Sequence, residues 1–437
     1  MKISVFGLGY VGTVVAGCLS KAGHEVIGVD IERHKVDFIN RGHAPIIERQ
    51  IDEIIATQVK ARRLSATTDV AAGVQLADVI LIAVGTPGLP NGELELTYLR
   101  RVSKEIGNAL KDHPGTPVIA VRSTTLPGTT REVVVPLLER TSEKRAGIDF
   151  KVCSNPEFLR EGSAVDDFYN PAKTVIGELG EGHGDRLIDL YADLPGPVAK
   201  MTLEAAEMIK YTDNAWHALK IGFANEIGNI CKAFTIDGHE VMDVFCKDRK
   251  LNISPAYLKP GFAFGGYCLP KDLRALLSKT KKIDVDVPIL SAILPSNELQ
   301  IERGLRAVLA AGKRKVGVLG ISFKAGTDDL RESPAIDLTE RLIGKGYDVR
   351  VYDHNVNLAR LNGTNRSYVL DRIPHICNLM APNVDAVIDH ADTLVVGNAA
   401  PEFENIPRRV RDDQLVVDLV RISKERSVDG VYEGICW

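Results

Sequence analysis

Short runs of apolar residues alternate with longer amphipathic stretches over the first 200 residues of the chain. The apolar runs at 2–6, 26–30, 79–84 and 118–121 predict strands, and each is followed by loop residues and then by a helical pattern. An uninterrupted apolar run such as 79–84 is typical of a strand that is covered on both faces. This rhythm predicts a parallel α/β sheet.

The pattern changes near residue 201. Residues 202–234 contain no proline and show helical periodicity, which predicts one helix long enough to connect two domains. Further helical segments extend to residue 310, interrupted by a loop at 255–270.

The last third returns to α/β, with a strand at 315–319, a helix at 334–345 and a strand at 348–352. Residues 344–353 repeat the order seen at 21–30, namely a helix end, a glycine, a strand and an aspartate. We therefore predict an α/β fold of two Rossmann-like doubly wound domains, 1–200 and 311–437, joined by a long helix and a central helical domain, 201–310.

Composition narrows the function classes. The chain is 45% hydrophobic and 26% charged, as expected of a globular protein, and its net charge of −4 argues against a nucleic-acid partner. The N-terminus passes directly into the first strand, so we expect neither a signal peptide nor a membrane association. The seven cysteines are scattered and form no CxxC motif, which favours no metal site and a reducing, cytoplasmic location.

A glycine motif follows the first predicted strand and opens a helix. Gly7 permits the tight turn, Gly9 lets the backbone approach a pyrophosphate, and Gly12 allows the helix to pack against the strand. Asp30 ends the second strand, where a carboxylate grips ribose hydroxyls and repels a 2′-phosphate, so NAD is favoured over NADP despite the nearby Lys35. The alternative is a glycine-rich turn beside an exposed aspartate.

A second group of reactive residues follows the loop at 262–266. Cys268 comes directly after a Gly-Gly-Tyr sequence and is followed by Lys271 and Asp272. A neighbouring cation lowers a thiol pKa, and on a helix Asp272 would share a face with Cys268, which suits a nucleophile beside a base. A buried structural cysteine is the alternative explanation.

The long helix carries a largely polar stripe at helical spacing, formed by Lys210, Asn214, His217, Ile221 and Asn225. Lys210 and Asn214 both donate hydrogen bonds and lie one turn apart, so they could stabilise an oxyanion. A solvated helix face is the common alternative.

Several loops follow predicted strands, at the edge of a doubly wound sheet where ligands bind. They are 85–87 and 122–128. A third loop, 155–161, mixes polar and apolar residues and contains two acids and an arginine. Each of the three taken alone is also compatible with a simple turn. The loop 320–326 of the second α/β domain has no GxGxxG, so we expect it to bind a different nucleotide, with Lys324 near the phosphates.

Taken together, these motifs resemble the UDP-glucose/GDP-mannose dehydrogenase family over essentially the whole chain. The matching segments are 7–12, 86–87, 123–124, 155–161, 210–214, 223–226, 265–272 and 323–333. The resemblance implies an enzyme with NAD in the first domain, a dimerising central domain and a nucleotide-sugar-binding last domain.

The resemblance also implies a mechanism. A sugar C6 alcohol is oxidised twice by NAD through a thiohemiacetal and a thioester on Cys268, with Lys210 and Asn214 stabilising oxyanions and Asp272, Glu161 and Thr124 handling protons or water. The implied cofactor-binding residues are Gly7, Gly9, Tyr10, Val11, Gly12, Asp30, Lys35, Thr86, Thr124, Lys271 and Arg331. The implied substrate-binding residues are Phe158, Leu159, Glu161, Lys210, Asn214, His217, Asn225, Tyr257, Lys259, Phe262, Gly265 and Lys324.

Within the family, residues 208–212, 216–217, 248–262 and 433–437 favour the members that act on GDP-mannose, with a homodimer of interlocked chains or a higher oligomer. Lys259 and Ala256 stand where those members usually have arginine and tyrosine, and Tyr267 replaces the commoner serine. The alternatives are the same reaction on UDP-glucose or a UDP-N-acetylhexosamine, a two-electron dehydrogenase that stops at the aldehyde, and a non-catalytic nucleotide-sugar-binding protein.

Overall fold

The computed structural model describes residues 1–250, 257–356, 374, 376–422 and 432–437. The chain forms two compact units, and each is considered by itself. The first comprises Met1–Asp213 and Arg274–Lys279, and the second comprises Asn214–Leu273 and Thr280–Trp437.

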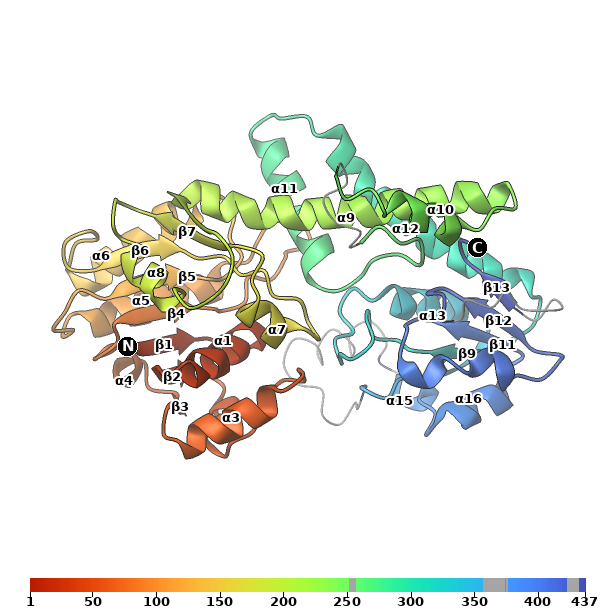
Figure 1. Ribbon diagram of the computed structural model, residues 1–437, viewed down its shortest axis with the longest axis horizontal. Helices are drawn as coiled ribbons and strands as arrows, with labels where there is room; N and C mark the ends of the chain where they lie inside the picture. The colour runs from red at the N-terminus through yellow and green to blue at the C-terminus, as the bar shows by residue number, and fades with distance from the viewer. Residues whose placement is uncertain (251–256, 357–373, 375, 423–431) are drawn as a thin grey trace. The chain divides into compact units, whose positions relative to one another are not determined.

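The first unit is built on an eight-stranded sheet in the order β3-β2-β1-β4-β5-β6-β7-β8. The neighbouring strands are parallel except for β6 and β7, which are antiparallel. In Figure 1 these strands run from red to yellow-green. They are β1 (Lys2–Phe6), β2 (Glu25–Val29), β3 (Leu64–Thr67), β4 (Val79–Ile82), β5 (Val118–Val121), β6 (Lys151–Ser154), β7 (Thr174–Glu178) and β8 (Val198–Thr202).

Helices cover both faces of this sheet. One buried cluster joins the inward side chains of α1, α3, α7 and α8 to one face, and a second joins α4, α5 and α6 to the other. The helices of this unit are α1 (Tyr10–Lys21), α2 (Arg33–Asn40), α3 (Ile51–Lys60), α4 (Val70–Val74), α5 (Thr97–Leu110), the π-helical η1 (Thr130–Val134), α6 (Val135–Ser142), α7 (Ala164–Tyr169) and α8 (Asp185–Leu190).

The second unit contains a five-stranded parallel sheet in the order β10-β9-β11-β12-β13. Its strands are β9 (Lys315–Leu319), β10 (Asp348–Tyr352), β11 (Thr393–Val396), β12 (Leu415–Asp418) and β13 (Tyr432–Gly434). Buried side chains of α12 and α13 pack on one face and those of α16 on the other.

Long helices precede this sheet in the chain. The longest, α9 (Leu203–Ala233), has 31 residues and crosses the boundary between the two units, as α11 (Cys268–Lys282) also does. The other helices before β9 are α10 (Gly238–Phe245) and α12 (Pro288–Ala310). The helices between the strands of the sheet are α13 (Pro334–Gly344), α15 (Ile376–Leu379), α16 (Val384–His390) and the 3-10 turns η2 (Pro401–Phe403) and η3 (Ile406–Arg408).

The structure confirms the predicted fold of two Rossmann-like sheets and a long helical middle. Two strands end earlier than predicted, β2 at Val29 and β4 at Ile82. The loop predicted for 255–270 was too long, because α11 already begins at Cys268, and Pro270 is tolerated in its first turn, where a backbone N–H has no helical partner. The boundaries at 200 and 310 stay predictions.

Candidate functional site

The glycine loop after β1 has little room for side chains at two of its three glycines. Gly7 has φ +96°, and a Cβ there would meet the Ala83 carbonyl oxygen at 2.8 Å. A Cβ on Gly12 would lie only 1.8 Å from the Gly7 carbonyl oxygen, whereas nothing lies within 4 Å of a Cβ on Gly9. The loop is therefore closed against its own sheet and open at Gly9, where α1 begins, and this cradle fits the pyrophosphate of a dinucleotide.

Asp30 directly follows β2 and is 9% exposed. Its carboxylate accepts hydrogen bonds from the Leu8 amide at 2.7 Å and the Glu32 amide at 2.8 Å. Lys35 lies 3.7 Å from this carboxylate and pairs more closely with Glu32, at 2.7 Å. The cation nearest Asp30 is thus already neutralised by acids, which favours NAD over a cofactor with a 2′-phosphate.

The first turn of α1 contains Tyr10 and Val11. The Tyr10 hydroxyl donates to Glu48 and accepts from the Gly162 amide at 2.9 Å. Burial, together with the Glu48 carboxylate, raises the pKa of the Tyr10 phenol, so the hydroxyl stays protonated as a donor. The glycine loop is thereby tied to the segment that follows β6.

The ends of β4 and β5 are also joined. The Thr86 hydroxyl donates to the Thr124 carbonyl oxygen at 2.7 Å, and the Ser123 hydroxyl donates to the Val84 carbonyl oxygen at 2.7 Å. Thr86 and Thr124, which the sequence placed in separate loops, therefore lie together at the carboxyl edge of the sheet.

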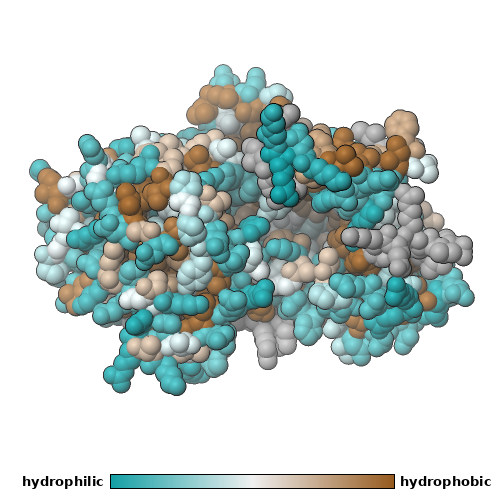
Figure 2. Space-filling view, viewed as in Figure 1, coloured by the Kyte–Doolittle hydropathy of each residue, from teal (hydrophilic) through white to brown (hydrophobic). Residues whose placement is uncertain are grey.

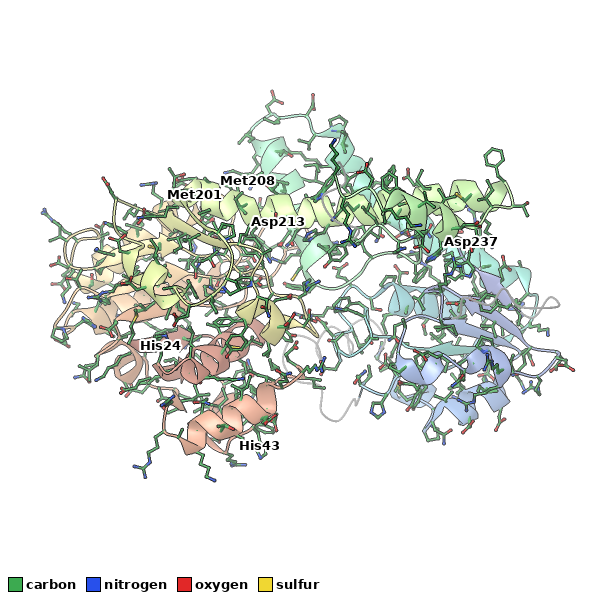
Figure 3. The ribbon with its side chains drawn as sticks, viewed as in Figure 1. His24, His43, Met201, Met208, Asp213 and Asp237 are labelled. Carbon is green, nitrogen blue, oxygen red and sulfur yellow. The ribbon has the colours of Figure 1, made fainter. Side chains whose placement is uncertain are left out.

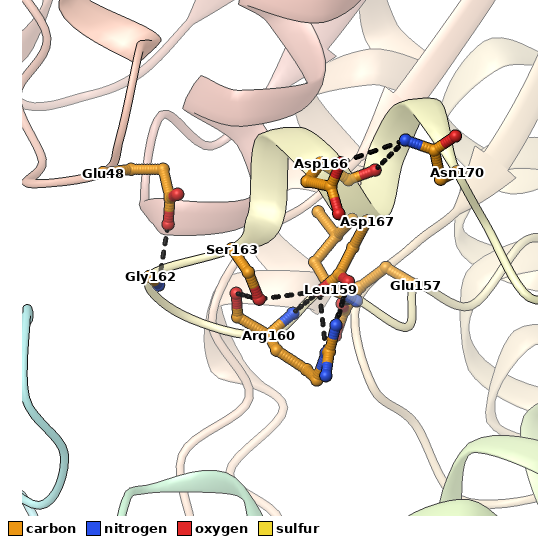
Figure 4. Close-up of polar contacts among 9 residues, drawn as sticks. All are labelled: Glu48, Glu157, Leu159, Arg160, Gly162, Ser163, Asp166, Asp167 and Asn170. Carbon is orange, nitrogen blue, oxygen red and sulfur yellow. Dashed lines mark hydrogen bonds and ion pairs between the residues drawn. The ribbon is translucent and has the colours of Figure 1, made fainter.

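In the segment after β6, the buried carboxylate of Glu157 pairs with Lys210, and the ring of the next residue, Phe158, lies beside the same lysine. Lys210 Nζ lies 2.9 Å from Glu157 and 5.6 Å from the centre of the Phe158 ring. The other oxygen of the Glu157 carboxylate accepts from the Leu159 amide at 2.7 Å (Figure 4). Sequence reasoning missed Glu157, because an acid in a loop gives no sign of its distant partner.

Hydrogen bonds within the segment hold its remaining residues. Arg160 pairs with Asp167 of α7, and the Gly162 amide donates to Glu48 at 2.8 Å (Figure 4). Glu161 lies between these two anchors and is partly exposed. Its backbone position is therefore fixed from both sides.

The polar stripe of α9 is largely buried, which contradicts a solvated face. Lys210, Asn214 and Asn225 are 5%, 7% and 3% exposed, and His217 and Ile221 are intermediate. Met208 and Asp213, labelled in Figure 3, lie along the same helix. Such burial of polar groups requires partners, and the contacts of Lys210, Asn214 and Asn225 supply them.

Cys268 is exposed at the first residue of α11, which contradicts a buried structural cysteine. One turn further, Lys271 Nζ lies 2.6 Å from Asp272, and the Asn214 amide donates to the same carboxylate at 2.5 Å. Burial acts to lower the pKa of Lys271, but the charges of Asp272 and Cys268 outweigh it and raise that pKa. A fixed ammonium and a helix N-terminus thus both favour the Cys268 thiolate.

Side-chain amides hold the irregular backbone before Cys268. The Asn225 side chain binds two consecutive residues of this loop. It accepts from the Gly261 amide at 2.9 Å and donates to the Phe262 carbonyl oxygen at 3.1 Å. Asn297 does the same for the N–H and C=O of Phe264, at 2.8 and 2.9 Å. The structure thus assigns Asn225 a contact with the loop, and sequence reasoning missed Asn297.

Close packing fixes the Gly265-Gly266 pair. A Cβ on Gly265 would lie 2.5 Å from the Glu332 carbonyl oxygen, and Gly266 has φ +83°. The next residue, Tyr267, lies under the Arg331 guanidinium at 4.4 Å. Arg331 in turn is held by Asp329 at 2.6 Å.

The remaining predicted substrate residues are spread over the second unit. The Tyr257 ring stacks on His217 with centroids 4.7 Å apart, Lys259 forms an ion pair with Asp243, and Lys324 is exposed in the loop after β9. Ala256 lies outside the described residues.

Two further searches cover the described residues. No helix among them is both long and apolar enough to cross a membrane. In the same part of the chain, no group of three or more His, Cys, Asp or Glu side chains could hold a metal ion.

Comparison with protein families gives three matches in chain order. They are the NAD binding domain of the UDP-glucose/GDP-mannose dehydrogenase family over residues 1–195, its central domain over 204–299 and its UDP binding domain over 317–425.

Individual relatives match along the whole chain. GDP-mannose 6-dehydrogenase of Pseudomonas putida is 50% identical, with 100% of both chains covered. Among solved structures, a UDP-glucose dehydrogenase from the archaeon Pyrobaculum islandicum has a TM-score of 0.90 at 32% identity, covering 100% of this chain and 98% of the other. A ternary complex of GDP-mannose dehydrogenase from Pseudomonas aeruginosa has a TM-score of 0.58 at 49% identity, with 100% of both chains covered.

Proposed function

The chain belongs to the UDP-glucose/GDP-mannose dehydrogenase family and is an NAD-dependent nucleotide-sugar dehydrogenase, and from this premise we propose that it oxidises GDP-mannose to GDP-mannuronate. The observation that carries the substrate is the 50% identity over the full chain to a protein named GDP-mannose 6-dehydrogenase. UDP-glucose is the second candidate, favoured by the TM-score of 0.90 to a UDP-glucose dehydrogenase. Lys259 also points that way, since lysine lacks the bidentate fork of arginine.

The first domain would hold NAD, which when bound supplies a hydride acceptor for the sugar C6. The open backbone at Gly9 and the N-terminus of α1 suit the pyrophosphate, and the Asp30 carboxylate suits ribose hydroxyls. Thr86 and Thr124, joined at the sheet edge, are proposed to line the reactive end of the cofactor.

Cys268 is the proposed nucleophile. After the first oxidation its thiolate adds to the C6 aldehyde, forming a C–S bond and an oxyanion that Lys210 and Asn214 stabilise. The second oxidation leaves a thioester. Water then adds to the carbonyl carbon, the C–S bond breaks, and the thiolate departs with the carboxylate formed.

Proton transfers complete the balance. One alcohol, one water and two NAD⁺ give one carboxylate, two NADH and three protons. Asp272 and Glu161, with Thr124, are proposed to orient the water or accept its proton. Asp272 suits this role because Asn214 and Lys271 fix its position.

A homodimer is proposed from the exposed apolar side chains of α9, α10 and the turn between them (Figure 2). They include Phe223, Phe234, Ile236, Val241, Val244 and Phe245, which are 37% to 73% exposed. Exposed apolar clusters of this kind mark interaction surfaces. Light scattering on the purified chain should give at least twice its 47.7 kDa mass.

The first test is the amount of NADH formed per nucleotide sugar, measured with limiting GDP-mannose and with limiting UDP-glucose in parallel. Two NADH from GDP-mannose and none from UDP-glucose are expected. If two NADH form from UDP-glucose and none from GDP-mannose, the substrate is UDP-glucose and the proposed four-electron chemistry stands. One NADH with a trappable aldehyde would contradict the four-electron reaction.

The cysteine is tested by Cys268→Ser, which should reduce uronate formation at least a hundredfold, because a serine hydroxyl is not ionised at neutral pH. Cys18→Ala is the matched control. Burial raises the pKa of the Cys18 thiol to about 12, so this cysteine is inert and its loss should leave the rate within about twofold. Normal uronate formation by Cys268→Ser would disprove the thioester.

A further inference from the structure

Three lysines are buried within the described residues, and their surroundings differ. Lys210, Lys220 and Lys271 are 5%, 6% and 5% exposed. Lys210 lies 2.9 Å from the carboxylate of Glu157, and Lys271 lies 2.6 Å from that of Asp272. Within the described chain, Lys220 has no such acid. Its Nζ instead faces two aromatic rings, at 5.8 Å from the centre of Trp216 and 5.7 Å from that of Tyr257.

An ammonium in this position is poorly compensated. Removing an unpaired charge from water remains unfavourable even after the surrounding protein relaxes. A cation–π contact offsets only part of this cost, and both rings lie near the ~6 Å limit of that interaction. Burial accordingly lowers the pKa of Lys220. The chain therefore leaves a positive charge for which an external anion would be the natural partner.

The neighbouring residues indicate which anion. Tyr257, which faces Lys220, is stacked on His217, one turn before Lys220 on α9, and both are proposed substrate residues. The nearby cation Lys259 is already paired with Asp243. GDP-mannose, UDP-glucose and the UDP-N-acetylhexosamines share one anionic group, the diphosphate.

We propose that Lys220 binds the diphosphate of the nucleotide-sugar substrate. This inference rests on the proposed function only in that the ligand is a nucleotide sugar, since a diphosphate contact does not depend on the base or the hexose. Lys220 is a binding residue outside the set implied by the family resemblance. It acts on affinity and leaves the chemistry at Cys268 untouched.

The test is calorimetric binding of GDP, UDP, guanosine and inorganic pyrophosphate to the NAD-free full chain. Lys220→Met keeps the length of the side chain and removes the charge. It should weaken binding of whichever diphosphate the wild type binds at least tenfold, about 1.4 kcal/mol, while guanosine binding stays unchanged. Lys220→Arg should retain most of the affinity. In kinetics, KM for the sugar nucleotide should rise while KM for NAD stays within twofold.

Two controls make the result decisive. Lys247→Met removes an exposed charge from the same unit and should leave GDP and UDP affinity unchanged. Lys220→Gln serves if the methionine variant does not fold, as judged by its melting temperature.

The proposal would be overturned if Lys220→Met bound GDP and UDP with the same affinities as the wild type. An equal loss of guanosine binding would show a structural role instead. A change of oligomer mass without a change in affinity would show that Lys220 pairs with a second copy of the chain. If the wild type binds neither diphosphate and oxidises no nucleotide sugar, the proposed function itself has failed, which is a separate outcome.

Discussion

The loops after β1 and β9 are built on the same plan but present different surfaces to a ligand. Each begins with a glycine in the left-handed region, Gly7 at φ +96° and Gly320 at φ +84°. Each is closed by an aspartate that follows the next strand in the chain. Asp30 accepts from the Leu8 amide at 2.7 Å, and Asp353 accepts from the Ile321 amide at 2.9 Å.

The difference lies in what else each carboxylate binds. One oxygen of Asp353 also accepts from the Ser322 amide and hydroxyl, at 2.9 and 2.8 Å, and from the Asn398 amide at 3.2 Å. Among the described residues, Asp30 has only two backbone donors within hydrogen-bond distance, and α1 begins three residues after Gly7. In the second domain α13 does not begin until Pro334. The Asp353 carboxylate is therefore occupied by hydrogen bonds that hold its own loop together. The equivalent carboxylate of Asp30 can still accept hydrogen bonds from a ribose.

The largest expected effect is that of Gly12→Ala. The new methyl group would lie 1.8 Å from the Gly7 carbonyl oxygen, so backbone must move, at a typical cost of about 1–3 kcal/mol or more. NAD affinity should fall at least a hundredfold, with a lower melting temperature, measured by calorimetry and thermal unfolding. Gly9→Ala is the control, because its methyl group meets nothing within 4 Å and should weaken NAD binding without destabilising the fold. Normal NAD affinity in Gly12→Ala would contradict the proposal that the glycine loop after β1 binds the pyrophosphate of NAD.

Asp353→Asn should destabilise the protein while leaving the KM for NAD unchanged. The carboxylate is 4% exposed, and an amide NH₂ in its place would face donors. Hydrogen bonds to charged groups contribute about 1.5–3 kcal/mol, so urea unfolding should show a loss of about 2 kcal/mol or more. An unchanged free energy of unfolding would show that the hydrogen bonds of Asp353 do not stabilise the loop after β9.

The sequence predicted what depends on neighbouring residues in the chain. The apolar runs predicted two α/β sheets through the strands β1, β2, β4, β5, β9 and β10. The glycine motif and Cys268 stood out because their chemistry is local. The sequence could not predict the pairing of Asn214 with Asp272, which are 58 residues apart, or that of Lys210 with Glu157. Lys220 carries no sequence signal, since a helical lysine is ordinarily solvated. Such pairings depend on how the chain folds back, and periodicity records only which face is buried.

Acid should weaken the second unit through His239. Burial, reinforced by the positive charge of Arg421, lowers the pKa of His239 from 6.5 to about 4. The unfolded chain therefore binds a proton that the folded chain does not between these values. Stability is full above pH 6.5 and falls as the pH approaches 4, by up to about 2 kcal/mol at pH 5. Urea unfolding at pH 7.5 and 5.0, followed by tryptophan fluorescence, measures the loss, because Trp437 lies 4.8 Å from His239. His239→Gln should flatten the dependence, and an equally steep profile in that variant would assign it elsewhere.

The smallest expected effect separates the two aspartates most directly. Asp30→Asn keeps an acceptor oxygen for the Leu8 amide but removes the charge that would grip a ribose, so KM for NAD should rise about tenfold, which corresponds to about 1.4 kcal/mol. Stability should change by less than in Asp353→Asn, because Asp30 accepts fewer hydrogen bonds from the protein. Removing the carboxylate should also relax the discrimination against NADP, since the repulsion of a 2′-phosphate is lost while Lys35 remains. Steady-state kinetics with NAD and NADP, together with urea unfolding, should be measured for both variants. Asp30→Asn should mainly raise KM for NAD, and Asp353→Asn should mainly lower the free energy of unfolding. The same defect from both would mean that the two loops differ in sequence only, and that the hydrogen bonds of Asp30 also serve to hold its own loop together.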